Sequence, residues 1–309
     1  MTTWSFARPI IAAVVCLSAC AVSPWLRAEE PEDTHIIETI LRSRHEILQR
    51  STRTNDSVFL AVWDFDGTIL KGDCSEGLAV DGKTVYPGLA LVAIEQGLSA
   101  LYPRDGGYEK FWMDYTNMDA RVGHWLAYPF IPQMLRGARA EQVLTLSQGH
   151  FANTLSNYLM DSSVKIIHAL QRGGVECHVI SASADLFVKG AAASLGVPAK
   201  DIHGIEVQTR DGRLTEELVY PITWNIGKRE RLQKIVDEIA HRPGSPNVYV
   251  LAGFGDSYNT DGPFLKLIAT QTLPAGVPIS VFYDTNGSQS KEYEGLFYHA
   301  RHLATVSGK

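Results

Sequence analysis

The alternation of apolar and polar residues divides the chain into segments of two kinds. Residues 35–50 carry apolar side chains at helical spacing along one stripe, which predicts an amphipathic helix. Residues 58–63 form a continuous apolar run, which is typical of a strand buried on both faces of a parallel sheet. Further strands are predicted over residues 175–180, 248–252 and 278–283. Further helices are predicted over residues 163–172, 184–195 and 228–240.

The order of these segments indicates the fold class. Strands separated by helices imply right-handed βαβ crossovers and a doubly wound, Rossmann-like parallel sheet. Within residues 205–219 the turn dipeptide Asp211-Gly212 predicts a β-hairpin. We therefore expect an α/β protein.

Residues 72–160 differ from the segments on either side. They lack evident strands, and prolines divide them into short segments, which predicts helices. We predict a helical cap domain over residues 72–160, inserted after the first core strand, with an α/β core over residues 29–71 and 161–309. The region holds an aromatic cluster of Phe111, Trp112, Tyr115, Trp125, Tyr128 and Phe130. This cluster is either the core of the cap or a cage for a quaternary ammonium group.

The first 28 residues are typical of a secretory signal. Arg8 precedes an apolar run over residues 10–22 that is shorter than a membrane span, and small residues follow. Cleavage before Cys20, in a sequence like a bacterial lipobox, would leave a lipid anchor, whereas cleavage after Ala28 would release the protein. An uncleaved anchoring segment is the alternative. We expect an exported protein, in the bacterial periplasm or anchored in the envelope, that contacts membrane through this segment alone.

The net charge bears on whether the protein binds nucleic acid, and the cysteine content bears on disulfides and metal sites. The net charge of -6 argues against nucleic acid, because phosphate backbones attract basic surfaces. Beyond the signal region only Cys74 and Cys177 remain, and export permits a disulfide between them without requiring one. Cys177 lies in a predicted strand, which favours a small buried apolar residue. The spacing of Cys and His residues does not indicate a zinc site.

Two acids follow the first core strand directly. Ligands of open parallel sheets bind at the carboxyl ends of the strands, where Asp64 and Asp66 are placed. One carboxylate can attack phosphorus, and the other can protonate the leaving alcohol and later activate water. Gly67 permits a tight turn, and Thr68 offers a hydroxyl or an N–H group to an oxyanion. A plain turn is the alternative, although it leaves Asp64 unexplained.

Polar residues also follow the next strands along the chain. Ser181 can donate to a phosphoryl oxygen, while Ser183 is the candidate N-cap of the following helix. Lys228 can neutralise charge near a phosphoryl group, with Arg229 and Arg231 as alternatives.

Residues 255–261 place two acids and an amide in one predicted loop. Asp256, Asn259 and Asp261 offer the hard oxygen ligands that Mg²⁺ prefers. A calcium-binding loop and a plain surface turn are the alternatives.

The set Asp-x-Asp-Gly-Thr, strand-end Ser, Lys and Gly-Asp-x-x-x-x-Asp resembles the haloacid dehalogenase superfamily of phosphatases, over residues 58–283. The resemblance implies Mg²⁺ as cofactor. It implies that Asp64 is the nucleophile and a metal ligand, and that Asp66 is the acid/base and a metal ligand through its carbonyl. By the same resemblance Asp256 is a third metal ligand, with Asp261 and Asn259 supporting the metal site.

The resemblance also assigns the phosphoryl-binding groups. Thr68 and Ser181 would hold the phosphoryl group, and Lys228 would offset charge on both the nucleophile and the substrate. Residues 179–183 and 224–228 are similar to the phosphoserine phosphatase and phosphorylcholine phosphatase branch.

These expectations combine into one function and several alternatives. We expect a phosphomonoesterase that acts through an aspartyl-phosphate on a small phosphomonoester such as phosphocholine or phosphoserine. Asp114, Asp119 and Glu109 are candidates for contacting an amino group of the substrate. The alternatives are a phosphotransferase with an alcohol acceptor, a non-catalytic binding protein on the same fold, and a dehalogenase, which would not need the acid Asp66.

Overall fold

The computed structural model of the chain describes residues 32–50, 57–244, 246–283 and 290–302. The predicted secretory signal, with Cys16 and Cys20, lies outside the described residues, so export stays a prediction. Among the described helices, none combines the length and the apolar character needed to cross a membrane.

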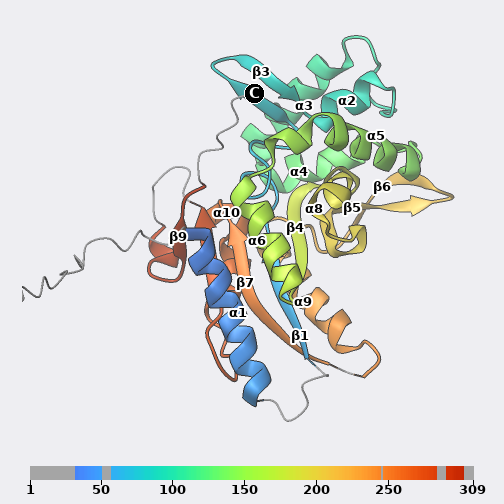
Figure 1. Cartoon of the computed structure of the whole chain (residues 1–309). Coiled ribbons are helices and arrows are strands. Elements are labelled where there is room, and N and C mark those ends of the chain that lie inside the picture. The colour runs from blue at the N-terminus through green and yellow to red at the C-terminus, as the bar shows by residue number, and fades with distance from the viewer. Residues whose placement is uncertain (1–31, 51–56, 245, 284–289, 303–309) are drawn as a thin grey trace, which may run out of the picture. The chain divides into compact units, whose positions relative to one another are not determined.

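A seven-stranded sheet has the strand order β6-β5-β4-β1-β7-β8-β9 (Figure 1). β1 lies between β4 and β7 and pairs in parallel with both, whereas β6 pairs antiparallel with β5. The α/β fold with a mostly parallel sheet is therefore confirmed. The strands are β1 (Ser57–Trp63), β4 (Glu176–Ala184), β5 (Ile202–Arg210), β6 (Arg213–Val219), β7 (Asn247–Gly255), β8 (Ile279–Tyr283) and β9 (Tyr298–Ala300).

Both faces of β1 are buried, which explains its uninterrupted apolar sequence. Phe59, Ala61 and Trp63 belong to one hydrophobic core, and the alternate residues Leu60 and Val62 belong to another. Residues of α1 (Glu32–Arg50) and α6 (Asp161–Arg172) join the first core. Residues of α9 (Ile226–Ala240) and α10 (Tyr258–Ala269) join the second. The two layers of helices hold the ends of the central strands in fixed positions.

The chain between β1 and α6 forms an insertion, which Figure 1 shows at the end of the sheet. Its elements are β2 (Gly77–Val80), β3 (Lys83–Pro87), α2 (Leu89–Glu95), α3 (Gly107–Val122), α4 (His124–Gln133) and α5 (Ala140–Asn153). The region is mainly helical, as predicted. It also contains the antiparallel strand pair β2–β3, which was not predicted. Its strands are short and largely exposed, so they lack the apolar signal of a core strand. The division into core and cap domains stays an interpretation of this arrangement.

Two further predictions of secondary structure were wrong, and one more strand was missed. The single helix expected over residues 184–195 is broken into α7 (Asp185–Val188) and α8 (Ala192–Leu195) by a 3₁₀ turn. Gly190 lies in that turn, where a Cβ atom would come within 2.7 Å of the backbone of Ser147 in α5. Residues 255–261 are not one loop, because α10 begins at Tyr258 and therefore contains Asp261. The three-residue strand β9 was also missed.

Candidate active site

Asp64 follows β1 and is held in place from three directions. Its N–H group donates to the carbonyl of Phe254 in β7, at 2.8 Å. Its carboxylate accepts a hydrogen bond from the hydroxyl of Thr68, at 3.1 Å, and another from the ammonium group of Lys228. Asp64 is 4% exposed, and burial, reinforced by Asp261, raises its pKa to about 7.

Lys228 lies in the first turn of α9 and has no exposed surface. Its Nζ atom donates to Asp64 and to Oδ1 of Asp261, the latter at 2.6 Å. Burial alone would lower the pKa of Lys228, but the carboxylates of Asp261 and Asp64 raise it above its ordinary value. Since buried charges are retained when they are paired, the ammonium group stays charged between the two acids.

The segment after β7 brings Asp256 to the same place. Gly67 makes this approach possible, because a Cβ atom there would lie 2.0 Å from Oδ2 of Asp256. Oδ2 of Asp261 accepts hydrogen bonds from the N–H groups of Asp256 and Ser257, at 3.1 and 3.0 Å. Both oxygens of Asp261 are therefore engaged by protein donors. Asn259 is exposed, and its backbone carbonyl accepts from Asn225.

The donor set here fits a divalent cation. Single oxygens of Asp64, Asp256 and Asp261 all lie within 4.8 Å of one another. Burial, reinforced by the charges of Asp64 and Asp261, raises the pKa of Asp256 to about 9. Asp64 and Asp256 line the cavity described below, whereas Asp261 is fully buried and does not line it, so Asp64 and Asp256 are the carboxylates that face a hard cation such as Mg²⁺.

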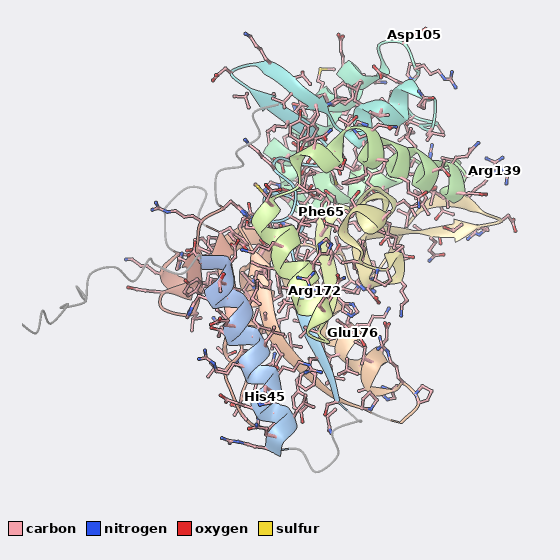
Figure 2. All side chains as sticks on the ribbon, viewed as in Figure 1. His45, Phe65, Asp105, Arg139, Arg172 and Glu176 are labelled. Atoms are coloured by element: carbon pink, nitrogen blue, oxygen red, sulfur yellow. The ribbon has the colours of Figure 1, made fainter. Side chains whose placement is uncertain are left out.

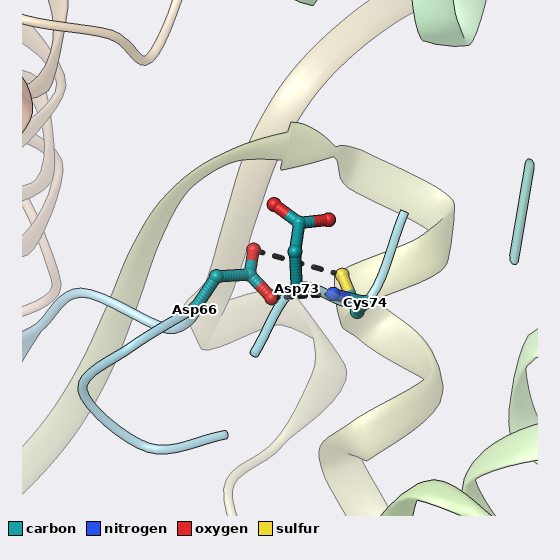
Figure 3. Close-up of side chains that lie close together, drawn as sticks. All are labelled: Asp66, Asp73 and Cys74. Carbon is teal, nitrogen blue, oxygen red and sulfur yellow. Dashed lines mark hydrogen bonds between the residues drawn. The ribbon is translucent and has the colours of Figure 1, made fainter. Parts of the chain in front are cut away.

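Asp66 turns its carboxylate toward the insertion, where Cys74 and Asp73 lie beside it (Figure 3). The N–H group of Cys74 donates to Oδ1 of Asp66 at 2.7 Å. The hydroxyl of Ser183 donates to Oδ2 at 2.7 Å, and that of Ser181 lies 3.4 Å from the same atom. Burial, followed by the charge of Asp73, raises the pKa of Asp66 to about 7.

The expected role of Ser183 as a helix cap was wrong. Residue Ala184 occupies the N-cap position of α7, without a side-chain hydrogen bond, and the Ser183 hydroxyl binds Asp66 instead. Ser181 is fully buried and accepts a hydrogen bond from the N–H group of Ser183, at 3.0 Å. Of the two serines, Ser183 is the one that lines the cavity described next.

A cavity of 190 Å³ opens above these residues. We call the residues from the strand ends and following segments its floor, and those from the insertion its wall. The floor consists of Asp64, Asp66, Ala182, Ser183, Asp256, Ser257 and Thr260. The wall consists of Asp73, Glu76, Tyr115, Tyr128 and Ile131. The insertion therefore supplies part of the surface that a ligand of Asp64 would contact.

The acids of the wall were missed by the sequence analysis. Oδ1 of Asp73 accepts from the N–H groups of Ser75 and Glu76, at 2.7 and 2.8 Å, which fixes the turn. The hydroxyl of Tyr115 donates to Oε1 of Glu76 at 2.5 Å. Burial raises the pKa of both acids, that of Asp73 to about 7. The sequence signal that was available for this turn is Asp73 followed two residues later by Ser75, shortly after the Asp64 motif.

The residues expected to contact an amino group lie elsewhere. Asp114 accepts from the hydroxyl of Tyr102 and lines a separate 600 Å³ cavity on the insertion. Asp119 pairs with His124 at 2.6 Å, and Glu109 is exposed. The aromatic cluster divides: Phe111 is buried in the hydrophobic core and Tyr115 and Tyr128 line the cavity, while Trp112 and Trp125 are 38% and 51% exposed.

Cys74 and Cys177 are both buried and unpaired. Cys177 lies in β4, and burial raises the pKa of its thiol to about 12, which agrees with its expected role as a small apolar residue. Cys74 lies beside Asp66, to which it donates both through its backbone N–H group and, at 3.7 Å, through its thiol (Figure 3).

The sequence matches the family of haloacid dehalogenase-like hydrolases over residues 61–266. That segment runs from within β1 into α10 and so contains both the floor and the insertion. No curated protein matched the sequence.

Solved structures that share the fold include the following three. A protein of unknown function from Bordetella pertussis Tohama I has a TM-score of 0.55 at 16% identity, with 73% of this chain and 90% of that chain covered. A conserved protein from Anaerococcus prevotii DSM 20548 has a TM-score of 0.55 at 14% identity, with coverage of 83% and 87%. Cytosolic 5'-nucleotidase IIIB bound to cytidine has a TM-score of 0.53 at 16% identity, with coverage of 90% and 88%.

Proposed function

The chain belongs to the haloacid dehalogenase-like hydrolase family, and on that basis we propose that it hydrolyses a small phosphomonoester through an aspartyl-phosphate on Asp64. One observation carries the proposal. A buried carboxylate lies on the floor of a cavity and contacts both an ammonium group and a hydroxyl, while a second acid lies two residues away. This arrangement suits covalent catalysis followed by acid/base catalysis.

In the first step a carboxylate oxygen of Asp64 attacks phosphorus. The O–P bond to Asp64 forms, the P–O bond to the alcohol breaks, and protonated Asp66 gives its proton to the departing oxygen. In the second step Asp66, now a carboxylate, takes a proton from water as the water oxygen attacks the same phosphorus. Phosphate leaves, Asp64 is restored, and Asp66 is protonated again.

Lys228 and the hydroxyls have supporting roles in this proposal. Lys228 offsets the charge of Asp64 and of the incoming phosphoryl group, and Thr68 orients the attacking carboxylate. Ser181 and Ser183 orient Asp66.

Mg²⁺ is the cation that we propose for the carboxylates of Asp64 and Asp256 and the carbonyl of Asp66. When bound, it supplies positive charge that stabilises the phosphoryl oxygens. Asp261 accepts hydrogen bonds from the N–H group of Asp256 and from the ammonium group of Lys228, and in this proposal it thereby keeps both residues oriented around the cation site.

The wall favours an alcohol that carries a positive charge. Asp73 and Glu76 place two acids in the cavity, and burial, together with the charges of Asp66 and Asp119, raises the pKa of Glu76. Tyr115 and Tyr128 add aromatic rings, which attract a quaternary ammonium group. We therefore propose phosphocholine and phosphoserine as the first substrates to test.

The experiment measures phosphate release from phosphocholine, phosphoserine and neutral phosphomonoesters, with Mg²⁺ or with EDTA. Asp64→Asn is expected to lower kcat about 1,000-fold or more, because it removes the nucleophile. EDTA is expected to abolish activity, and Mg²⁺ to restore it.

Asp105→Asn is the matched control, because Asp105 is exposed near the tip of the insertion (Figure 2). It should retain wild-type kcat. Undiminished phosphate release by Asp64→Asn would refute the proposed nucleophile. Undiminished release in EDTA would refute the metal requirement.

A further inference from the structure

The loop that follows Asp64 is held from beneath by a segment near the described end of the chain. The imidazole of His302 stacks on Tyr283, at the end of β8, with ring centroids 3.9 Å apart. Its Nε2 atom lies 3.2 Å from the carbonyl of Gly67, and its Nδ1 atom lies 3.2 Å from the hydroxyl of Ser162 in α6. These three contacts fix both the plane and the rotation of the ring.

The partners of the ring determine its tautomer. A carbonyl oxygen can only accept a hydrogen bond, so Nε2 carries the proton and donates to Gly67. In a neutral ring Nδ1 then accepts from the hydroxyl of Ser162. Burial lowers the pKa of His302, which favours this neutral form.

Gly67 connects the ring to the reacting groups. Its carbonyl and the N–H group of Thr68 belong to one planar peptide, so a fixed carbonyl fixes the backbone of Thr68. The hydroxyl of Thr68 donates to Asp64, and Cα of Gly67 packs against the carboxylate of Asp256. Rotation of this peptide would therefore move groups on both sides of Asp64.

The adjacent peptide is held in the same manner. The hydroxyl of Ser163 donates to the carbonyl of Thr68 at 2.6 Å, and Ser163 is fully buried. The first turn of α6 thus reaches the loop directly through Ser163 and indirectly through Ser162 and His302. In turn, α1 holds the segment that carries His302, because Glu32 accepts from the N–H group of Arg301 at 3.2 Å.

We propose that His302 is a positioning residue for catalysis at Asp64, acting through the hydrogen bond from its Nε2 atom to the carbonyl of Gly67. This inference rests on the proposed function of Asp64. It predicts that loss of the hydrogen bond affects the chemical step more than substrate binding, since His302 is not among the residues that line the cavity.

The test compares His302→Ala with His302→Gln. His302→Ala is expected to lower kcat about tenfold with little change in KM, as loss of an outer hydrogen bond does at many catalytic sites. A Gln amide can donate to the carbonyl of Gly67, so His302→Gln should recover most of the lost kcat. His299→Ala is the matched control, because His299 lies in β9 and packs against Phe282. It should change thermal stability without changing kcat.

Hydrogen exchange provides a readout that does not need activity. Backbone amides of residues 64–71 should exchange faster in His302→Ala than in wild type or His302→Gln. Ser162→Ala should shift exchange and kcat in the same direction, and should add little in the His302→Ala background.

The outcomes separate the two proposals. If the wild-type protein releases no phosphate, the proposed function fails, while exchange still tests the contact at Gly67. Unchanged kcat and unchanged exchange in His302→Ala would overturn the inference. Equal losses in His302→Ala and His302→Gln would overturn it too, because packing rather than the hydrogen bond would then be responsible.

Discussion

The acids on the floor and on the wall of the cavity have partners of different kinds. Behind the floor, the ammonium group of Lys228 contacts both Asp64 and Asp261, so Asp64 has a cationic partner supplied by the chain. On the wall, Asp73 and Glu76 are held by backbone N–H groups and by the hydroxyl of Tyr115. The nucleophile Asp64 thus has a fixed cation before a substrate arrives, whereas the two acids of the wall have hydrogen-bond donors but no cationic partner among the described residues.

This difference suggests a division of labour. Groups fixed by mutual contacts suit a reaction that requires constant geometry, because preorganised charge costs nothing to rearrange as the reaction proceeds. Acids without a cationic partner suit selection of a ligand that brings the cation itself. The floor would then determine the reaction, and the wall would determine which alcohol is accepted.

The largest expected effect tests the floor. Lys228→Met removes the cation between two buried carboxylates and should destabilise the protein by about 3 to 5 kcal/mol. It should also lower kcat by about 100- to 1,000-fold, because a preorganised charge at the phosphoryl group is lost. Urea unfolding and steady-state kinetics measure the two effects.

Lys234→Met is the matched control on the same helix. Lys234 lies 4.0 Å from Glu238, and its side chain is 47% exposed. Because exposed ion pairs contribute little, its loss should change stability by about 0.5 kcal/mol or less. Equal effects of the two substitutions would contradict the view that the floor depends on its buried cation.

The fold could be predicted wherever the sequence carries a long apolar signal. β1, β4, β7 and β8 are buried strands, and their apolar runs identified them. β2 and β3 were missed because they are short and largely exposed, with the same polar character as a loop. α10 was missed because its first turns contain Gly262 and Pro263, which usually end a helix, whereas Ser257 caps it here.

A substitution on the wall should have a smaller effect, and one that depends on the charge of the substrate. Glu76→Gln should raise KM about tenfold for phosphocholine and phosphoserine, because a tenfold change corresponds to the free energy of about one charge-assisted hydrogen bond. Neutral phosphomonoesters should keep their KM, because they carry no cation for Glu76 to contact. The ratio of kcat/KM between charged and neutral esters measures the effect.

Glu109→Gln is the control for charge alone, because Glu109 is an exposed acid of the same insertion. It should leave the ratio unchanged. If Glu76→Gln raised KM equally for neutral and charged esters, the wall would affect folding or access to the cavity and would not respond to the charge of the substrate.

Most of the site could be predicted from sequence because its residues stand at or just beyond the ends of strands. Asp64, Asp66 and Asp256 follow buried strands and Ser181 lies near the end of β4, and parallel strands end at one edge. Lys228, in the first turn of α9, was predicted from its charge. The contact between Ser183 and Asp66 joins residues 117 positions apart, and that between Tyr115 and Glu76 joins residues 39 apart. No local pattern encodes such pairs, since they depend on how the insertion packs on the sheet.

The smallest expected effect concerns the exposed aromatic residues of the insertion. Trp125 packs edge-on against Trp224 with ring centroids 4.7 Å apart, and it does not line the cavity. Trp125→Ala should therefore lower the free energy of unfolding by about 1 kcal/mol, the weight of one aromatic pair, while KM for phosphocholine stays the same. Tyr128→Ala is the counterpart inside the cavity, and it should raise that KM about tenfold if the ring contacts the ammonium group. The reverse ranking would assign cation binding to the exposed tryptophans instead of the wall, and it would remove the distinction between a floor whose nucleophile has its own cation and a wall that selects the substrate.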